Sequence, residues 1–225
     1  MAYVAYILDS TVCGDSLELL STLEDNAVPL TLTDIPYNVV NRETSGIRNF
    51  DKGNADEITF NLSALIPQLV RVTSGSIYVW CSTEQVSELR AGFVAAGLTT
   101  RLCIWEKTNP SPVNCQYLWM SSIECCVFAR KSKATFNAKY ESPVWRFPVV
   151  SRQKHPTQKP LGLFEKLVAT SSNPSDVVLD PFMGSGTTAV ASLSQGRHFF
   201  GSDLDPDYVA LANARAADVQ LTFPS

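Results

Sequence analysis

Short apolar runs alternate with helical patterns along the whole chain, and this alternation constrains the fold more than any other feature. Strands that alternate with helices form a mostly parallel sheet with helices on both faces. The chain is therefore predicted to be an α/β protein. The apolar runs predict seven strands, at residues 4–8, 28–33, 75–81, 100–105, 123–130, 177–180 and 198–203. The segments between them predict helices at residues 16–23, 56–72, 83–96, 160–170, 187–194 and 206–217.

Glycine and proline mark several predicted boundaries. Gly97 is expected to end the helix at residues 83–96, and Pro160 to occupy the first position of a later helix. Pro67 is expected to kink its helix. Residues 38–55 show no apolar period and are predicted to be a mobile, functional loop, whereas residues 131–154 are expected to be irregular and basic.

The length of 225 residues predicts a single domain over 1–225, and 45% hydrophobic with 18% charged residues is typical of a globular protein. The chain contains no run of about 18 apolar residues and begins without a basic segment, so neither a membrane span nor a signal peptide is expected. Six cysteines form no Cys-x-x-Cys pair and only two histidines occur, so no metal site is expected. Reduced cysteines in a cytosol-like compartment are the default.

The net charge of −4 hides an uneven distribution. Residues 106–154 contain eight basic and three acidic side chains, which leaves that segment at +5. A local basic surface matters more for binding a polyanion than the charge of the whole chain. A solvated loop region would explain the same pattern equally well.

Candidate site residues follow three of the predicted strands. In a parallel sheet, ligands bind outside the carboxyl ends of the strands. Three polar segments occupy such positions, namely residues 34–37, residues 180–188 and Asp203.

The segment at residues 180–188, Asp-Pro-Phe-Met-Gly-Ser-Gly-Thr-Thr, is the strongest of the three. Its glycines allow close approach of a ligand to the backbone, and the helix that follows offers free N–H groups. Asp203, 19 residues beyond Gly184, stands where an acid commonly holds ribose hydroxyls. A phosphate-binding loop would need a lysine after Gly186, a dinucleotide fingerprint would tolerate Ala189, and a plain tight turn is a further alternative. Asp180 would repel a pyrophosphate but suits a cationic ligand.

These motifs occur in a characteristic order. Asp-Ile-Pro-Tyr-Asn at residues 34–38 comes first, His-Pro-Thr-Gln-Lys-Pro at 155–160 follows much later, and the glycine-rich segment comes last. In this order the chain resembles the β-class, circularly permuted DNA amino-methyltransferases, which modify adenine N6 or cytosine N4. The resemblance spans nearly the whole chain. It implies a Rossmann-like fold that uses S-adenosylmethionine and releases S-adenosylhomocysteine.

The resemblance also implies roles for individual residues. The Asp34 carboxylate and the Ile35 carbonyl would accept the hydrogens of the target amino group, and Tyr37 would stack on a base flipped out of the duplex. Ile35 departs from the proline usual in the family, but it keeps the carbonyl, and Pro36 restrains it to an extended conformation. The residues implied for the cofactor are Asp15, His155, Gln158, Lys159, Asp180, Phe182, Gly184, Ser185, Gly186, Thr187 and Asp203.

Double-stranded DNA is the implied partner. An inserted region at about residues 109–154 is expected to read the DNA sequence, because this region is basic and contains aromatic side chains. The region is short, which suggests a short target site or one read with a second subunit in a homodimer. The expected DNA-binding residues are Asn38, Arg42, Arg48, Lys107, Arg130, Lys131, Lys133 and Lys139.

Several alternatives remain open. Cytosine N4 is the nearest one, although that group typically has serine where this chain has Asp34. A nicotinamide-dependent oxidoreductase would use the same fold, and a degenerate, non-catalytic DNA-binding homologue is a third reading, suggested by Ile35. The resemblance further implies a cytoplasmic protein of prokaryotic or phage origin, of the kind found in restriction-modification systems.

Overall fold

The computed structural model describes residues 8–37, 61–112, 115–150 and 159–222. Several sequence predictions lie outside these residues. They are most of the strand at 4–8, the loop at 38–55, the start of the helix at 56–72, and the site residues Asn38, Arg42, Arg48, His155 and Gln158.

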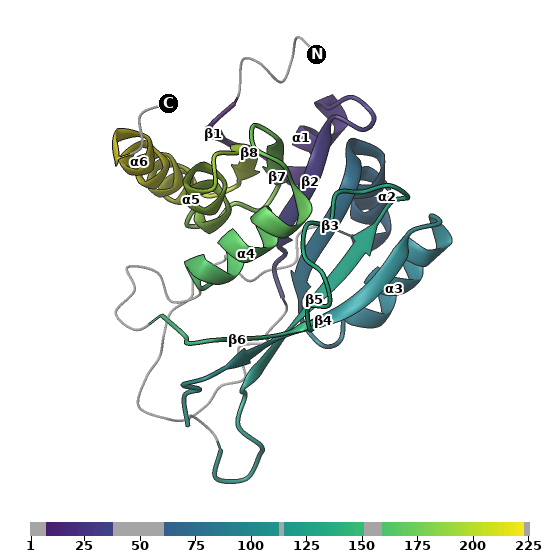
Figure 1. The fold of residues 1–225 in the computed structure, drawn as a ribbon, viewed down its shortest axis with the longest axis vertical. Helices are drawn as coiled ribbons and strands as arrows, with labels where there is room; N and C mark the ends of the chain where they lie inside the picture. The colour runs from purple at the N-terminus through teal and green to yellow at the C-terminus, as the bar shows by residue number, and fades with distance from the viewer. Residues whose placement is uncertain (1–7, 38–60, 113–114, 151–158, 223–225) are drawn as a thin grey trace.

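The described residues form one eight-stranded sheet in the order β1-β8-β7-β2-β3-β5-β4-β6 (Figure 1). The strands are β1 (Ser10–Cys13), β2 (Val28–Asp34), β3 (Thr73–Cys81), β4 (Thr99–Lys107), β5 (Ile123–Arg130), β6 (Val144–Phe147), β7 (Val177–Asp180) and β8 (His198–Asp203). The helices are α1 (Ser16–Thr22), α2 (Leu62–Val72), α3 (Val86–Ala95), α4 (Leu161–Ser171), α5 (Thr187–Ser194) and α6 (Pro206–Thr222).

The strand directions confirm the prediction of a mostly parallel sheet. The neighbours from β1 through β8, β7 and β2 to β3 are all parallel, and β6 is parallel to β4. Only β5 runs antiparallel, to β3 on one side and β4 on the other. The predicted count of seven strands was wrong, because β6 lies in the segment expected to be irregular. The strand β1, which begins at Ser10, was not predicted, and the strand predicted at 4–8 lies mostly outside the described residues.

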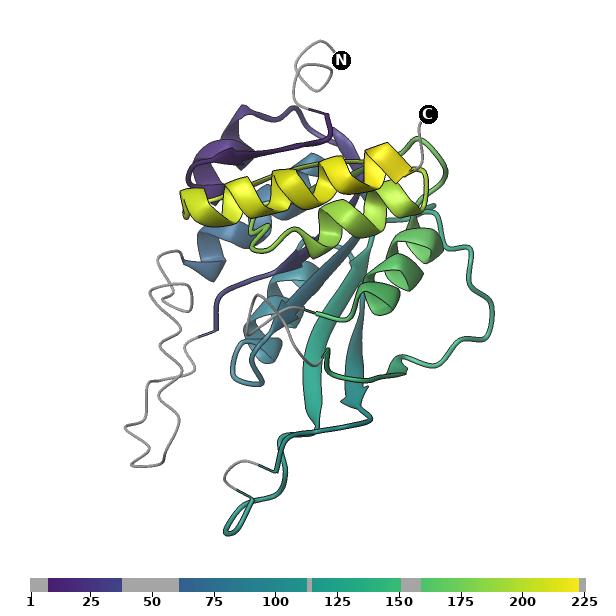
Figure 2. The same cartoon turned by 90° about the vertical axis from the view of Figure 1, so that its left-hand side faces the viewer.

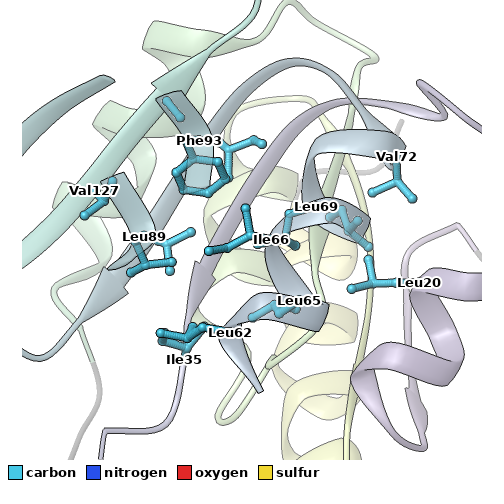
Figure 3. Packing of buried hydrophobic residues seen from close by; sticks show 14 of the residues in the cluster. Leu20, Ile35, Leu62, Leu65, Ile66, Leu69, Val72, Leu89, Phe93 and Val127 are labelled. Carbon is cyan, nitrogen blue, oxygen red and sulfur yellow. The ribbon is translucent and has the colours of Figure 1, made fainter. Parts of the chain in front are cut away.

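Helices cover both faces of this sheet. On one face lie α1, α2 and α3, whose side chains Leu65, Leu69, Leu89 and Phe93 are fully buried (Figure 3). On the other face lie α4 and α5, with Trp80 of the sheet stacked on the ring of α4 residue Phe164 at a centroid distance of 6.1 Å. The outermost helix is α6, which packs on α5, on the edge strand β1 and on its neighbour β8 (Figures 1 and 2).

The helix boundaries show how local chemistry and packing act together. Gly97 has a φ of 82°, as expected of a residue that ends a helix, and Pro67 lies inside α2. Pro160 is the N-cap of α4, one position before the predicted one. The helix predicted from residue 83 begins only at Val86, because the side chain of Gln85 accepts a hydrogen bond from the Ser82 N–H and forms a turn there.

Gly186 is the glycine on which the packing of α5 depends. It caps α5 with a φ of 81°, in the left-handed region. A Cβ atom at this position would also lie 2.7 Å from the Cα of Ala212 on α6. Both the turn and the approach of α6 therefore require glycine.

We expect Gly186→Ala to lower the free energy of unfolding by about 2 kcal/mol or more, because strain at positive φ adds to the clash with α6. Chemical denaturation of the cofactor-free protein would measure this loss. Gly14→Ala is the matched control, since a Cβ there meets nothing within 4 Å. Equal stability of the two variants would contradict this account of Gly186.

Candidate active site

Three neighbouring parallel strands end side by side at one edge of the sheet, and the candidate site lies there. Asp34 is the last residue of β2, Asp180 of β7 and Asp203 of β8. Because β2 neighbours β7, and β7 neighbours β8, their carboxyl ends meet at this edge. The structure thus brings together the three segments that the sequence analysis singled out.

Asp203 is held against the glycine-rich turn. One of its carboxylate oxygens accepts a hydrogen bond from the Gly184 N–H at 2.7 Å, and the other accepts one from the Asp205 N–H at 3.0 Å. The Gly14 N–H donates to the Asp203 carbonyl oxygen at 3.0 Å, which fixes the end of β1 beside it. This geometry holds an acid at the position expected for one that binds ribose hydroxyls.

Asp15 lies just beyond this contact and caps a helix. Its side chain accepts hydrogen bonds from the N–H groups of Leu17 at 2.8 Å and Glu18 at 3.1 Å. This is the capping geometry that satisfies the free donors at a helix start. The structure therefore gives Asp15 a structural role at the same sheet edge as Asp203.

Asp180 is almost completely buried, with 2% of its surface exposed. Its carboxylate accepts hydrogen bonds from the hydroxyls of Thr33 at 2.6 Å and Thr188 at 2.5 Å, and from the Phe182 N–H at 3.1 Å. Burial raises the pKa of Asp180 to about 7, and these hydrogen bonds oppose the shift. The carboxylate thus ties β2, β7 and α5 together, in place of the free contact with a cation that the sequence analysis expects.

The remaining residues of the glycine-rich segment are packed into the protein. Ser185 and Thr187 are buried, and the guanidinium of Arg215 donates hydrogen bonds to the carbonyl and hydroxyl oxygens of Ser185. Phe182 is partly buried against the core on the other side of the loop. The backbone of this loop is therefore held rigidly at the start of α5.

A second cluster surrounds Asp34. The hydroxyl of Tyr37 donates a hydrogen bond to one oxygen of the Asp34 carboxylate, and the ammonium of Lys159 donates to the other. Lys159 also donates to the Tyr37 hydroxyl oxygen at 2.7 Å. Burial raises the pKa of Asp34, and the ion pair with Lys159 opposes this shift. The acid, the tyrosine and the lysine thus form one hydrogen-bonded unit.

Lys159 lies just before α4, and 6% of its side chain is exposed. Its ammonium lies 5.6 Å from the centre of the Trp80 ring and 5.3 Å from that of Tyr37. Burial lowers the pKa of Lys159, but the charges of Asp34, Tyr37 and Glu124 raise it well above its ordinary value. The sequence analysis expects Lys159 beside a cofactor carboxylate, whereas its partners within the protein are these side chains.

Glu124 belongs to this cluster and was missed by the sequence analysis. It lies on β5, and its carboxylate forms ion pairs with Lys159 at 3.2 Å and with Lys107 at 2.9 Å. Burial raises its pKa, but the two lysines lower it below the ordinary value overall. The sequence signal that could have identified Glu124 is its position as an acidic residue within the apolar run at residues 123–129.

The segment at residues 35–36 is held by its backbone and by apolar packing. The Ile35 side chain is 1% exposed and lies beside Leu62 in the core (Figure 3). Its N–H donates to the Trp80 carbonyl at 3.2 Å, and the Gln85 side chain donates to the Pro36 carbonyl at 3.2 Å. The isoleucine therefore contributes to the core, and its side chain is directed away from the Asp34 carboxylate.

The described residues expected to bind DNA are not brought together. Lys107 lies at the site but is paired with Glu124. Arg130 is opposite Ser76, near the start of β3, so the end of β5 lies at the sheet edge away from Asp34. Lys131 and Lys133 follow Arg130 directly, and Lys131 donates to Asn26 at 2.8 Å. Lys139 is exposed in the segment between β5 and β6, which runs beside α4.

The described part of the chain contains neither a candidate metal-binding cluster nor a candidate membrane-spanning helix. Within residues 8–37, 61–112, 115–150 and 159–222, histidine, cysteine and acidic side chains form no group of three or more that could hold a metal ion. None of the helices in these ranges is long and apolar enough to cross a membrane.

The fold and the site together define a class of protein. The Asp34 segment precedes the glycine-rich loop by well over a hundred residues in the chain, yet Thr33 and Asp180 are hydrogen-bonded to each other. This permuted arrangement on a mostly parallel sheet is that of a Rossmann-like, S-adenosylmethionine-dependent methyltransferase. A family model described as DNA methylase matches residues 28–214, so the chain belongs to the N6-adenine and N4-cytosine DNA methylase family.

Individual relatives agree with this assignment. The Type II methyltransferase M2.LlaDCHI of Lactococcus lactis subsp. cremoris is 30% identical over 236 residues, which cover 91% of this chain and 87% of the relative. M2.MboI of Moraxella bovis is 28% identical over 237 residues, which cover 92% and 86%.

Solved structures agree as well. The M1.HpyAVI–SAM complex superposes with a TM-score of 0.71 at 28% identity, over 92% of this chain and 98% of the other. The cytosine-N4-specific PvuII DNA methyltransferase has a TM-score of 0.72 over 95% of this chain and 93% of the other. At 15% identity, that second likeness shows the fold alone.

We expect Asp180→Asn to change how stability depends on pH. A carboxyl whose pKa is raised on folding destabilises the folded state increasingly as the pH rises from its unfolded pKa to its folded pKa of about 7. The unfolding free energy of the wild type, relative to the variant, should therefore fall by about 2 kcal/mol between about pH 5.5 and pH 8. Denaturation curves at the two pH values would measure this. Parallel pH profiles for the two proteins would show that Asp180 is not responsible.

Proposed function

We propose that this chain transfers the methyl group of S-adenosylmethionine to the N6 amino group of adenine in double-stranded DNA. The observation that carries the proposal is the Asp34 carboxylate, held at a strand end by Tyr37 and Lys159 beside the glycine-rich loop. The family includes enzymes for adenine N6 and for cytosine N4. An aspartate at position 34, in place of the serine typical of the cytosine enzymes, favours adenine.

The chemistry requires the amine to become a better nucleophile. Its lone pair is delocalised into the ring, and two acceptors that draw the N–H hydrogens out of the ring plane localise it on nitrogen. The Asp34 carboxylate and the Ile35 carbonyl are these acceptors, and the carboxylate also stabilises the positive charge that develops on nitrogen. A nitrogen–carbon bond then forms as the sulfur–carbon bond breaks, and the methylated amine loses a proton.

The target base must leave the duplex to reach Asp34. Tyr37 is partly exposed, and its hydroxyl is fixed by Asp34 and Lys159, so its ring is held in one orientation. A fixed aromatic ring offers a stacking surface to a flipped base at little cost in conformational entropy. Tyr37 therefore serves as the stacking platform in this proposal.

S-adenosylmethionine supplies the methyl group as an electrophile bound to sulfur. The residues that would hold it are Asp203, at the ribose, and the backbone of the Gly184–Gly186 turn at the start of α5. Asp180 fixes this turn from within the protein. The M1.HpyAVI structure, which is a complex with SAM, supports this choice of cofactor.

For DNA contact we propose the loop between β4 and β5, which leaves the sheet at the same edge as Asp34. Lys107, at the end of β4, and Glu124, near the start of β5, lie within the charged cluster at Asp34. Beyond them the side chains of Tyr117 and Trp119 are 87% and 100% exposed. Exposed aromatic side chains stack on nucleic-acid bases. This loop replaces the basic residues 130–133 as the main contact, within the region proposed at about residues 109–154.

The relatives are Type II methyltransferases, which supports a role in DNA modification within a bacterial cytoplasm. A second copy of the chain would extend the short recognition region. Sedimentation of the protein with and without duplex DNA would detect such a homodimer.

We expect Asp34→Ala to lower methyl transfer by at least about a hundredfold, because the main acceptor of the amino group is lost. Binding of S-adenosylmethionine, measured by calorimetry, should be retained, since Asp34 lies outside the proposed cofactor contacts. Transfer of a tritiated methyl group to duplex DNA measures the rate, and mass spectrometry of the nucleosides identifies the base.

Asp207→Asn, on α6, is the matched control for an acidic side chain away from Asp34. Full activity of Asp34→Ala would overturn the mechanism. Methylation of cytosine in place of adenine would overturn the choice of base while leaving the role of Asp34 intact.

We expect Trp119→Ala to weaken binding to duplex DNA about tenfold, through the loss of one stacking contact. Lys133→Ala serves as the control, because Lys133 lies beyond the end of β5 at the edge away from Asp34. This variant should bind DNA as tightly as the wild type does. Fluorescence anisotropy with a labelled duplex would compare them. A larger loss of DNA affinity in Lys133→Ala than in Trp119→Ala would contradict this proposal and would indicate that the basic segment at residues 130–133 is the main DNA contact.

A further inference from the structure

Glu124 lies on the same face of the sheet as Asp34. Asp34 is opposite Trp80 on β3, and Trp80 is opposite Cys126 on β5. Side chains two residues apart on a strand share a face, so Glu124 lies with Cys126, two positions closer to the edge where β2 ends. Both carboxylates therefore face α4, which begins at Leu161, two residues after Lys159.

The two carboxylates stand on either side of the Lys159 ammonium. An ammonium has three donors, and in this structure it donates to Asp34 and to the Tyr37 hydroxyl. Glu124 Oε2 lies 3.2 Å away as an ion-pair partner, but this buried oxygen accepts no hydrogen bond from any of the described residues. The other oxygen of Glu124 is engaged by Lys107 at 2.9 Å. Glu124 thus offers Lys159 an acceptor that is already in place.

Lys159 and the target amino group compete for Asp34. Tyr37 donates to one oxygen of the Asp34 carboxylate and Lys159 to the other, so both oxygens are engaged before any base arrives. A buried ammonium that simply lost its carboxylate would be left uncompensated, at a large cost in free energy. A second carboxylate within reach removes most of that cost.

We propose, on the basis of the function proposed above, that Glu124 is a positioning residue that takes over the Lys159 ammonium when the target amino group binds Asp34. Asp34, Lys159, Glu124 and Lys107 alternate in sign, so the cluster is neutral before and after the ammonium shifts. The shift needs only a change of hydrogen-bond partner, with no proton transferred. Asp34 then presents a free oxygen to the amine while remaining an anion.

A double-mutant cycle on the full-length protein tests this proposal. Glu124→Gln keeps the shape of the side chain but removes the charge that receives Lys159. We expect kcat for DNA methylation to fall about tenfold or more, because the ammonium stays on Asp34. The Kd for S-adenosylmethionine should be unchanged. In a Lys159→Met background, the same Glu124→Gln change should have no further effect on kcat, since there is no ammonium to receive.

Glu106→Gln is the matched control, because Glu106 is a partly exposed acid on β4 that pairs with Arg146, outside the cluster at Asp34. An equal fall in kcat on Glu124→Gln in both backgrounds, or no fall in the wild-type background, would overturn the proposal. Absence of methylation by the wild type itself would instead refute the proposed function, which separates the two failures.

A crystal structure of the wild type with duplex DNA and an unreactive cofactor analogue gives a test that does not depend on a variant folding. The Lys159 ammonium is expected within hydrogen-bond distance of Glu124, at about 3 Å, and no longer bonded to Asp34. An ammonium still bonded to Asp34, with the flipped base in place, would overturn the proposal.

Discussion

The ion pair between Lys159 and Asp34 is the interaction on which the arrangement of the site depends. It joins residues 125 positions apart in the chain, one before α4 and one at the end of β2. Both groups are largely removed from water, so each charge needs a compensating partner close by. The stacking of Phe164 on Trp80 holds α4 over the same face, which keeps the ammonium at the strand end.

The three acids at this sheet edge differ in how their charge is compensated, and this separates their roles. Asp34 faces an ammonium, Asp180 is held by two hydroxyls and one N–H group in the interior, and Asp203 accepts backbone N–H groups at the glycine-rich turn. Burial raises the pKa of Asp180 to about 7, and the hydrogen bonds to its carboxylate oppose this shift. In the function proposed above, Asp34 serves the reacting amine and Asp203 the cofactor, whereas Asp180 holds the architecture together.

Much of the fold followed from the local pattern. The strands at 123–130, 177–180 and 198–203 and the helix at 187–194 agree with the structure, because each is an apolar run with clear boundaries. β6 could not be found in this way. It is four residues long, only Trp145 on it is buried, and it pairs with β4 at the outer edge of the sheet. Such a short edge strand forms only because it pairs with β4, which a local sequence pattern does not reveal.

The sequence by itself indicated the candidate site residues. The order and spacing of the motifs singled out Asp34, Tyr37, the glycine-rich turn and Asp203. The tertiary structure decided which charges meet. The antiparallel direction of β5 places Glu124 beside Lys159 and carries Arg130 to the opposite edge, although the two lie six positions apart. Strand direction depends on pairing between segments distant in the chain, and no local pattern of side chains encodes it.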